Sequence, residues 1–308
     1  MTLDELNEIV RNGDIDETIR VAEARQCKEL ARIADIICEK KDVRLVLLAG
    51  ASSAGKTTTA KRLATQIRVN ELEACYLSTD DYFVGNSRNP KDESGDYDYE
   101  TIECVDTERL TSNIANLLEG KAIHARKFDF VQHEGFDDEA LTSLPKKGIV
   151  ILEGLHALNP RLVEGLDHIG QFRIFIEPKT QPEIFIRTRL NPNDARLLRR
   201  LVRDHQFRKM TPEDTFARWP KVLAGEEKWI NPFRHLANLE FDSSLCYELA
   251  VLKPYAAGLL EMMRLQHPEE TKARFLADLL SIVEETNPTK VPGDSILRET
   301  IGGSQLDY

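Results

Sequence analysis

A complete G-x-x-x-x-G-K-T pattern occurs at Gly50-Ala51-Ser52-Ser53-Ala54-Gly55-Lys56-Thr57, directly after the apolar run Val43-Arg44-Leu45-Val46-Leu47-Leu48-Ala49 and before a helical pattern over 58–70. An apolar strand, a glycine-rich loop and a helix in this order are typical of a phosphate-binding loop. The glycines let backbone N–H groups close around a phosphate, and the helix directs its positive end toward it. We expect Lys56 to reach the β- and γ-phosphates of ATP, and Thr57 to offer its hydroxyl to Mg²⁺. The residues predicted to bind ATP here are Gly50, Ser52, Ser53, Ala54, Gly55, Lys56, Thr57 and Thr58.

Short apolar runs that alternate with helical patterns predict an α/β fold. The strand candidates beside 43–49 are 74–78, 148–152 and 172–176, and the helical patterns cover 58–70, 106–119 and 183–206. Runs that are apolar throughout are typical of parallel strands buried on both faces. Strand–helix alternation therefore predicts a three-layer sandwich of the P-loop NTPase type with a mostly parallel sheet, an arginine-rich lid and extra helices at both termini.

Charge and composition exclude several classes of partner. The chain has 308 residues and a formal net charge of −11, which disfavours broad binding to nucleic-acid polymers or anionic lipid. We find no apolar run near the roughly 20 residues that a bilayer span needs, and the first residues are acidic, so we expect a cytoplasmic protein without membrane contact. The five cysteines are far apart and form no C-x-x-C pair, so we expect them to be reduced and to bind no zinc.

Two carboxylates follow predicted strands, at the edge of the sheet where ligands bind in open α/β folds. Asp80 follows the strand at 74–78, and Glu153 follows the strand that ends at Leu152. We interpret Asp80 as a general base that also lies close to the metal, and Glu153 as a ligand of Mg²⁺ or of its water opposite Thr57. The alternative for either acid is a helix cap or a solvated loop residue.

Arginines share one face of the helix predicted near residue 200. Arg196, Arg199, Arg200 and Arg203 are spaced i, i+3, i+4 and i+7, and no acid lies between the first and the last. Their mutual repulsion favours an anion as the partner of this face, which indicates a phosphate-facing lid. We expect Arg196 and Arg199 to bind ATP, and Arg200 and Arg203 to stabilise charge during transfer. Ion pairs with acids elsewhere, such as Asp194 or Asp204, are the alternative.

The segment 124–133 combines aromatic rings, an acid and a histidine, which suits a flat heterocycle with polar edges. A switch GTPase would need a guanine-binding N-K-x-D motif, and the sequence has no Asn-Lys pair. The residues alone thus predict an ATP-dependent phosphotransferase that acts on a small hydroxyl compound.

Taken in order, these motifs resemble the uridine kinase and phosphoribulokinase family of P-loop kinases. The resemblance runs from about Val43 to the end of the chain and rests on the phosphate loop and four further motifs: Ser78-Thr79-Asp80-Asp81-Tyr82-Phe83, Phe128-Asp129-Phe130, Glu153-Gly154-Leu155-His156 and Arg199-Arg200-Leu201-Val202-Arg203-Asp204. It implies phosphorylation of a nucleoside 5′-hydroxyl, with uridine or cytidine as the first candidates and Asp80 rather than Asp81 as the base. It also implies homo-oligomers, which relatives commonly form.

Family resemblance further implies a set of substrate-binding residues: Asp80, Tyr82, Glu100, Phe128, His133 and Arg208. Two of them depart from the family pattern. Phe128 stands where typical members have a tyrosine whose hydroxyl helps to bind the pyrimidine, and Glu100 aligns with the aspartate that holds the ribose hydroxyls. These departures leave open a kinase for another small alcohol, such as a sugar phosphate, pantothenate or glycerate. A non-catalytic ATP-binding regulatory protein is a third possibility.

A closer resemblance is to the kinase half of bacterial uridine-kinase-like proteins that carry a TGS domain. Shared segments include Gly225-Glu226-Glu227-Lys228 and Ser295-Ile296-Leu297-Arg298-Glu299. We expect no TGS domain here, because the chain starts at what resembles the helical linker. The predicted organisation is an N-terminal helical segment (1–42), a P-loop kinase domain (43–265, with a lid at about 191–212) and a C-terminal helical extension and tail (266–308). We expect 244–285 to be largely helical, with breaks at Pro254 and near Pro268.

Overall fold

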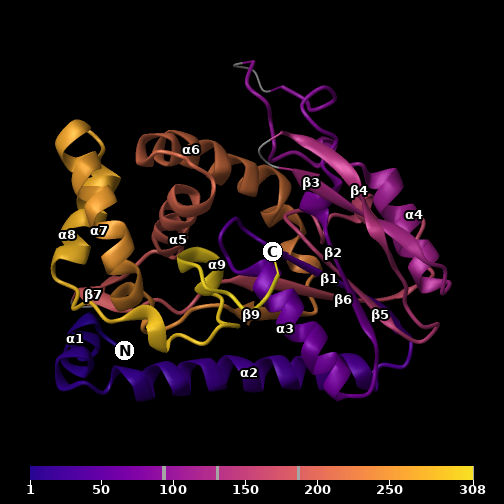
Figure 1. The fold of residues 1–308 in the computed structure, drawn as a ribbon, viewed down its shortest axis with the longest axis horizontal. Helices are drawn as coiled ribbons and strands as arrows, with labels where there is room; N and C mark the ends of the chain where they lie inside the picture. Colours follow the sequence, from indigo (N-terminus) through magenta and orange to yellow (C-terminus); the bar gives the residue numbers. More distant parts are fainter. Residues whose placement is uncertain (92–94, 130–131, 186–187, 308) are drawn as a thin grey trace.

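The computed structural model of the protein describes residues 1–91, 95–129, 132–185 and 188–307. At its centre lies a five-stranded sheet in the order β2-β5-β1-β6-β9, in which every pairing is parallel (Figure 1). Its strands are β1 (Val43–Gly50), β2 (Ala74–Ser78), β5 (Ile149–Glu153), β6 (Gly170–Glu177) and β9 (Leu239–Asp242). The predicted α/β fold with a parallel sheet is therefore confirmed.

Both faces of this sheet are buried, which explains why β1 is apolar throughout. Leu45 and Leu47 pack into the cluster on one face, together with α4 (Thr107–Leu118) and η3 (Pro160–Val163). Val46 and Leu48 pack into the cluster on the other face, together with α3 (Lys56–Val69) and the second half of α2 (Ile15–Glu39). The result is the predicted sandwich of a sheet between two helical layers.

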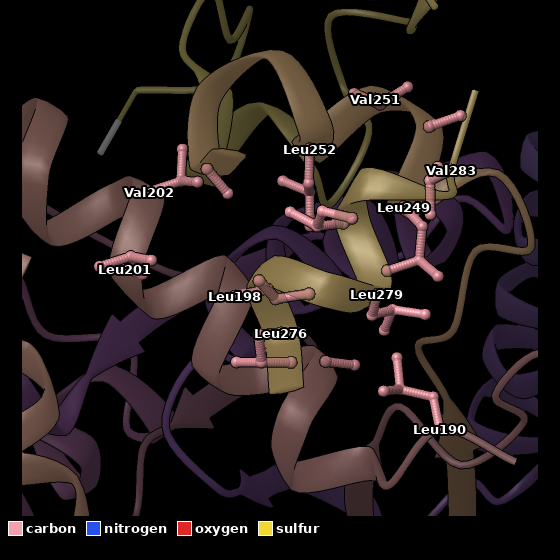
Figure 2. Packing of buried hydrophobic residues seen from close by; sticks show 14 of the residues in the cluster. Leu190, Leu198, Leu201, Val202, Leu249, Val251, Leu252, Leu276, Leu279 and Val283 are labelled. Carbon is pink, nitrogen blue, oxygen red and sulfur yellow. The ribbon is translucent and has the colours of Figure 1, made fainter. Parts of the chain in front are cut away.

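Beside the sheet lies a second core made of helices. It is built from α5 (Pro192–Phe207), α6 (Pro212–Trp229), α7 (Glu248–Gln266) and α8 (Thr271–Ser281), with α1 (Leu3–Asn12) and α9 (Arg298–Ile301) at its border. Figure 2 shows Leu198 and Val202 of α5 among side chains of α7 and α8, including Leu252 and Leu276. Residues from both ends of the chain thus share hydrophobic cores with the residues between them.

Two antiparallel hairpins complete the fold, and one of them corrects a prediction. β3 (Ile123–Asp129) pairs with β4 (Glu134–Thr142), and β7 (Glu183–Phe185) pairs with β8 (Thr188–Arg189). The helix predicted over 183–206 was wrong in its first part, because α5 begins only at Pro192. The Asn191 side chain accepts a hydrogen bond from the Asn193 N–H at 2.8 Å and caps the helix there.

Helix α7 continues through Pro254, where the sequence predicted a break. A proline inside a helix cannot donate to the carbonyl four residues earlier, which here belongs to Ala250. That carbonyl accepts instead from the backbone N–H of Thr286 at 3.0 Å. The break predicted near Pro268 is confirmed, since α7 ends at Gln266 and α8 begins at Thr271.

The remaining elements are short 3-10 helices. They are η1 (Thr79–Tyr82), η2 (Ile102–Cys104), η4 (Asn231–Leu236) and η5 (Pro288–Lys290). All five cysteines are free. Among the described residues, no helix has the length and apolar character needed to cross a bilayer.

A buried polar network ties α2, α3 and the start of α7 together. The carboxylate of Glu23 accepts a hydrogen bond from the Tyr247 hydroxyl at 2.6 Å and lies 3.4 Å from the Arg62 guanidinium. The side chains of Glu23 and Arg62 are each only 7% exposed. The Arg62 guanidinium also donates to the side-chain oxygen of Gln26 at 3.2 Å. Since α3 follows the phosphate loop, this network fixes the loop's helix against the N-terminal segment.

We expect Glu23→Ala to lower the free energy of unfolding by about 3 kcal/mol, because it leaves the buried Arg62 charge with only the half-exposed carboxylate of Asp294 at 3.9 Å. Glu17→Ala is the matched control: Glu17 lies on the same helix but is 65% exposed, and we expect a loss below about 1 kcal/mol. Urea unfolding at pH 7 measures both values. Equal losses in the two variants would show that the network does not hold α2 in place.

Candidate active site

The phosphate loop runs from the end of β1 into α3, as the sequence predicted. Two of its residues have left-handed backbone conformations, Ser53 with φ +60° and Gly55 with φ +88°. A side chain at Gly55 would also meet an obstacle, since a Cβ there would lie 2.5 Å from Ile296. The Nζ of Lys56 donates to the backbone carbonyl of Ala51 at 3.1 Å, which holds this lysine over the loop.

Glu153 and Thr57, which the sequence placed opposite each other, are in direct contact. The Thr57 hydroxyl donates to Oε1 of Glu153 at 3.0 Å. The same oxygen accepts from the hydroxyls of Tyr76 at 3.0 Å and Ser78 at 2.8 Å. Because β2 and β5 pair in parallel with Ser78 opposite Glu153, these side chains meet at the same edge of the sheet. A hydroxyl and a carboxylate beside a phosphate loop are the oxygen donors that Mg²⁺ prefers, so the residues fit this ion.

Burial changes the acidity of Glu153. Its side chain is 2% exposed, and loss of water, reinforced by the nearby charge of Asp80, raises the pKa of the carboxyl to about 7. The charge of Lys56 acts in the opposite direction. Tyr76 and Ser78 were missed as partners of Glu153, although both belong to the strand that leads to Asp80.

Asp80 lies in η1, where β2 ends. Its backbone N–H donates to the Ser78 hydroxyl at 3.3 Å, and its side chain is half-buried rather than enclosed. The turn after β5 passes very close to η1, because a Cβ at Gly154 would lie 1.7 Å from Thr79 Oγ1. Only a glycine therefore allows the ends of β2 and β5 to bring Asp80 and Glu153 together.

Four arginines of α5 lie beside the phosphate loop, and buried carboxylates pair with them. Arg196 and Arg199 are each 1% exposed. Arg196 makes a two-pronged ion pair with Glu226 of α6, at 2.6 and 2.7 Å, and Nε of Arg199 donates to Glu248 at 3.0 Å. For Arg196 and Arg199 the structure thus shows the alternative, pairing with acids elsewhere in the fold, although with Glu226 and Glu248 rather than with the acids that the sequence suggested.

The two paired arginines still touch the loop. Arg196 donates to the Ser52 carbonyl at 3.3 Å, and Arg199 lies 3.5 Å from the Ser53 carbonyl. Glu226 also accepts from the Ser52 N–H at 3.3 Å, so this glutamate joins the loop to α6. Glu226 was not singled out as a site residue, although it lies in one of the segments on which the closer resemblance rests.

Asp204 forms ion pairs with Arg200, Arg203 and Arg208. Pairing with Asp204 was the alternative that the sequence left open for the arginines of this helix. The fully buried carboxylate of Asp204 lies 3.1 Å from Arg200, 3.2 Å from Arg203 and 3.3 Å from Arg208. Arg200 reaches the loop directly, with Nη1 donating to the Ser52 hydroxyl at 2.9 Å. The charge of Arg203, followed by burial, lowers the pKa of Arg208 to about 10. Guanidinium groups thus lie beside the loop together with the carboxylate that pairs with them.

An aromatic group lies beyond the end of β2, around Phe83, which directly follows η1. The rings of Phe83 and Phe128 meet edge to face with centroids 5.5 Å apart. Tyr99 lies 6.4 Å from Phe83 and stacks on His133 at 6.1 Å. The structure therefore brings the predicted Phe128 and His133 together, and adds Phe83 and Tyr99, which were not assigned. Phe130, the last residue of the Phe-Asp-Phe motif, lies outside the described residues.

Glu100 lies next to the arginines, and α6 passes directly over it. A Cβ at Gly225 would be 2.4 Å from the Cβ of Glu100, so a glycine is required at this contact. Burial raises the pKa of Glu100 to about 7, although the charge of Arg200 opposes this shift. Its Oε2 atom is buried and has no hydrogen-bond partner among the described residues.

Tyr82 was predicted to bind the substrate, and this prediction was wrong, because its side chain lies in the hydrophobic core and not at the site. Its side chain is completely buried in the sheet core, and its hydroxyl accepts a hydrogen bond from the Asn113 amide at 2.9 Å. The residue belongs to a short helix, η1, in which consecutive side chains point to different sides. Asp80 therefore lies at the site while Tyr82 packs beneath it.

The raised pKa of Glu153 makes stability depend on pH. Between its ordinary value of 4.5 and about 7, the folded protein holds a proton that the unfolded chain has released, so the free energy of unfolding should fall as pH rises through this window. The amide of Glu153→Gln cannot ionise. The free energy of unfolding of this variant should therefore fall by on the order of 1–3 kcal/mol less than that of the wild type over the same pH range. Urea unfolding at pH 5 and 7.5 measures it, with the exposed Glu103→Gln as control. An equally steep fall in Glu153→Gln would contradict the shift.

Comparison with known proteins places this geometry in a family. The family model described as "Phosphoribulokinase / Uridine kinase family" matches residues 45–250. A uridine kinase of Ureaplasma parvum is 24% identical over 196 residues, which cover 63% of this chain and 86% of the relative. A uridine kinase of Borrelia turicatae is 27% identical over 206 residues, which cover 64% of this chain and 85% of the relative.

Among solved structures, a possible uridine kinase of Bacillus stearothermophilus is 18% identical in sequence to this chain, and the two structures superpose with a TM-score of 0.45. The match covers 71% of this chain and 98% of that structure. The family match includes the phosphate loop, both strand-end carboxylates and the arginine helix. The chain therefore belongs to the phosphoribulokinase and uridine kinase family, and it is a phosphotransferase with an alcohol group as acceptor.

Proposed function

We propose that the protein transfers the γ-phosphoryl group of ATP to the 5′-hydroxyl of a nucleoside, with uridine and cytidine as the preferred acceptors. The aromatic group of Phe83, Tyr99, Phe128 and His133 carries this proposal. Flat rings near Asp80 offer a stacking surface to a planar base. The uridine kinases to which the chain is similar support the same choice.

In the proposed reaction, Asp80 accepts the proton of the acceptor hydroxyl as its oxygen forms a bond to the γ-phosphorus. The bond between that phosphorus and the bridging β–γ oxygen breaks, and ADP leaves. Lys56 and the arginines Arg200 and Arg203 offset the negative charge on the moving phosphoryl group. Mg²⁺, which Thr57 and Glu153 would hold with Asp80 close by, would supply further neutralisation when bound. Arg196 and Arg199 would support the phosphates through the loop backbone.

A kinase for another small alcohol is the second candidate, and two residues favour it. Phe128 has no hydroxyl to bind a pyrimidine edge, and its side chain is 8% exposed. Glu100 presents a buried carboxyl oxygen without a partner among the described residues, next to Arg200. A sugar phosphate, pantothenate or glycerate would offer hydroxyls to such a group.

Asp80→Asn tests the proposed base. We expect the variant to lose about 100-fold to 10,000-fold in kcat, because the amide cannot take the proton. Asp81→Asn is the matched control: Asp81 is the neighbouring acid, lies 3.8 Å from Lys127, and should keep most of the activity. ADP release is followed with ATP, Mg²⁺ and a panel of nucleosides and other small alcohols.

Three results would count against the proposal. Turnover only with a non-nucleoside alcohol would support the second candidate. ATP binding without turnover on any acceptor would indicate a non-catalytic ATP-binding protein. Equal activity of the Asp80 and Asp81 variants would exclude Asp80 as the base.

Glu100 offers a second test, of the ribose contact. If its carboxyl binds the ribose hydroxyls, the wild-type protein should prefer uridine over 2′-deoxyuridine by about tenfold or more in kcat/KM. Glu100→Ala should lose this preference mainly by raising KM for uridine. The exposed Glu103→Ala serves as control and should keep the preference. A Glu100→Ala variant that still discriminates would assign the ribose contact to another group.

A further inference from the structure

Tyr76 of β2 contacts the carboxylate of Glu153, although it lies outside the motifs on which the family resemblance rests. Its hydroxyl donates to Oε1 of Glu153 at 3.0 Å. Tyr76 and Ser78 are two residues apart in β2, so their side chains lie on the same face of the sheet, and Ser78 is directly opposite Glu153 in β5. The register of these strands thus brings a tyrosine hydroxyl to the carboxylate beside the phosphate loop.

The ring of Tyr76 is held between the sheet and α3. It packs against the hydrophobic cluster on the α3 face of the sheet, and Nζ of Lys61 lies 5.2 Å from the ring centroid in a cation–π contact. Lys61 and Thr57 are four residues apart in α3, so they lie on the same side of this helix, one turn apart. The packed ring therefore fixes the direction of the hydroxyl, toward the carboxylate that Thr57 also contacts.

All the hydroxyls that contact the Glu153 carboxylate donate to the same oxygen. Those of Thr57, Tyr76 and Ser78 each donate to Oε1. Across the described part of the chain, Oε2 receives no hydrogen bond. A carboxylate has about four acceptor positions on its two oxygens, so three donors fill Oε1. Oε2 is therefore the oxygen that remains available to a further ligand.

Glu153 also differs from other buried acids in its partners. The other five buried acids that the structure describes each form an ion pair with an arginine or lysine: Glu23, Asp194, Asp204, Glu226 and Glu248. Within the same described residues, no basic side chain forms an ion pair with Glu153, which has only neutral hydroxyls as partners. Because an ionised carboxylate in a buried site needs a cation, this arrangement fits a cation supplied from solution.

We propose that Tyr76 is a positioning residue for the divalent cation, a role that rests on the proposed use of MgATP. Its hydroxyl fixes Oε1 of Glu153, and Oε2 stays available to the cation or to one of its water molecules. A side chain that orients a metal ligand raises the affinity for the metal without touching it. Tyr76 therefore acts through Glu153 and not on the substrate.

Tyr76→Phe tests this role, because it removes the hydroxyl and keeps the ring beside Lys61. Calorimetry on the full chain measures binding of a non-hydrolysable ATP analogue with Mg²⁺ and with EDTA, at pH 8, above the pKa of about 7 of the Glu153 carboxyl. The ratio of the two dissociation constants gives the contribution of the cation. We expect Tyr76→Phe to reduce this ratio by about tenfold and to change binding in EDTA by less than about twofold, since the lost contact acts only through a metal ligand.

Tyr247→Phe is the matched control. It also removes a tyrosine hydroxyl that donates to a buried glutamate, here Glu23 at 2.6 Å, but this glutamate pairs with Arg62 instead of a cation from solution. We expect the ratio in this variant to stay within about twofold of the wild-type value, because Glu23 is not a metal ligand. The control thus reports what the loss of such a hydrogen bond does to binding through the fold alone.

Three results would overturn the inference: an unchanged ratio in Tyr76→Phe, equal weakening with Mg²⁺ and with EDTA, or an equally reduced ratio in Tyr247→Phe. Equal weakening would show that the hydroxyl only shapes the phosphate loop. If the wild-type protein does not bind the ATP analogue, or binds it no more tightly with Mg²⁺ than with EDTA, the proposed use of MgATP fails, and the inference fails with it, whatever the variants do.

Activation of turnover by Mg²⁺ gives a second measurement, with the acceptor that supports turnover. We expect the Mg²⁺ concentration for half-maximal activity to rise about tenfold in Tyr76→Phe, while kcat at saturating Mg²⁺ stays within about threefold of the wild-type value. A lower kcat with an unchanged Mg²⁺ requirement would contradict the inference, since the hydroxyl would then act on the chemical step.

Discussion

A single buried carboxylate, that of Glu153, joins the phosphate loop to the sheet. It accepts hydrogen bonds from Thr57 on the loop and from Tyr76 and Ser78 on β2. These contacts exist because β2, β5 and β1 are adjacent, parallel and in register at their carboxyl ends. The position of Asp80 depends on the same edge, since it follows Ser78 by two residues. A change that shifts β5 would therefore disturb the loop, Asp80 and the contact between Thr57 and Glu153 together.

The second constraint is electrostatic, and it explains how an acidic protein concentrates cations at one place. α5 presents four arginines toward the loop, and buried acids hold them there: Glu226, Glu248 and Asp204. Like charges on one helix face repel, and charges without water need partners. The net charge of −11 thus coexists with a cluster of guanidinium groups that are paired with buried acids beside the loop. Because Glu226 also accepts from the Ser52 N–H, the loop and the arginines form one connected polar unit.

Residues outside the family match contribute to the stability of this unit. α2 holds α3 through Glu23 and Arg62, and the C-terminal segment covers Gly55 through Ile296. Both segments share hydrophobic cores with the central residues.

The sequence by itself determined the phosphate loop, the parallel α/β fold and the position of Glu153 opposite Thr57. These features are local: a strand, a glycine-rich loop and a helix are adjacent in the chain, and strand-end residues share one edge of the sheet. The sequence also singled out the segment 124–133 for its aromatic rings and histidine, and Phe128 and His133 of this short segment belong to the aromatic group.

Only the tertiary structure decided the rest. The partners of Arg196 and Arg199 are Glu226 of α6 and Glu248 of α7, which lie 30 and 49 residues further along the chain. No spacing rule predicts that a buried guanidinium will meet these acids. Tyr82 and Asp80 are two residues apart, yet the geometry of η1 sends one into the core and the other to the site. The helix through Pro254 survives because the Thr286 N–H satisfies the carbonyl that the proline cannot. For the two arginines and for Pro254, the decisive contact joins residues distant in sequence, and such contacts form only when the chain folds.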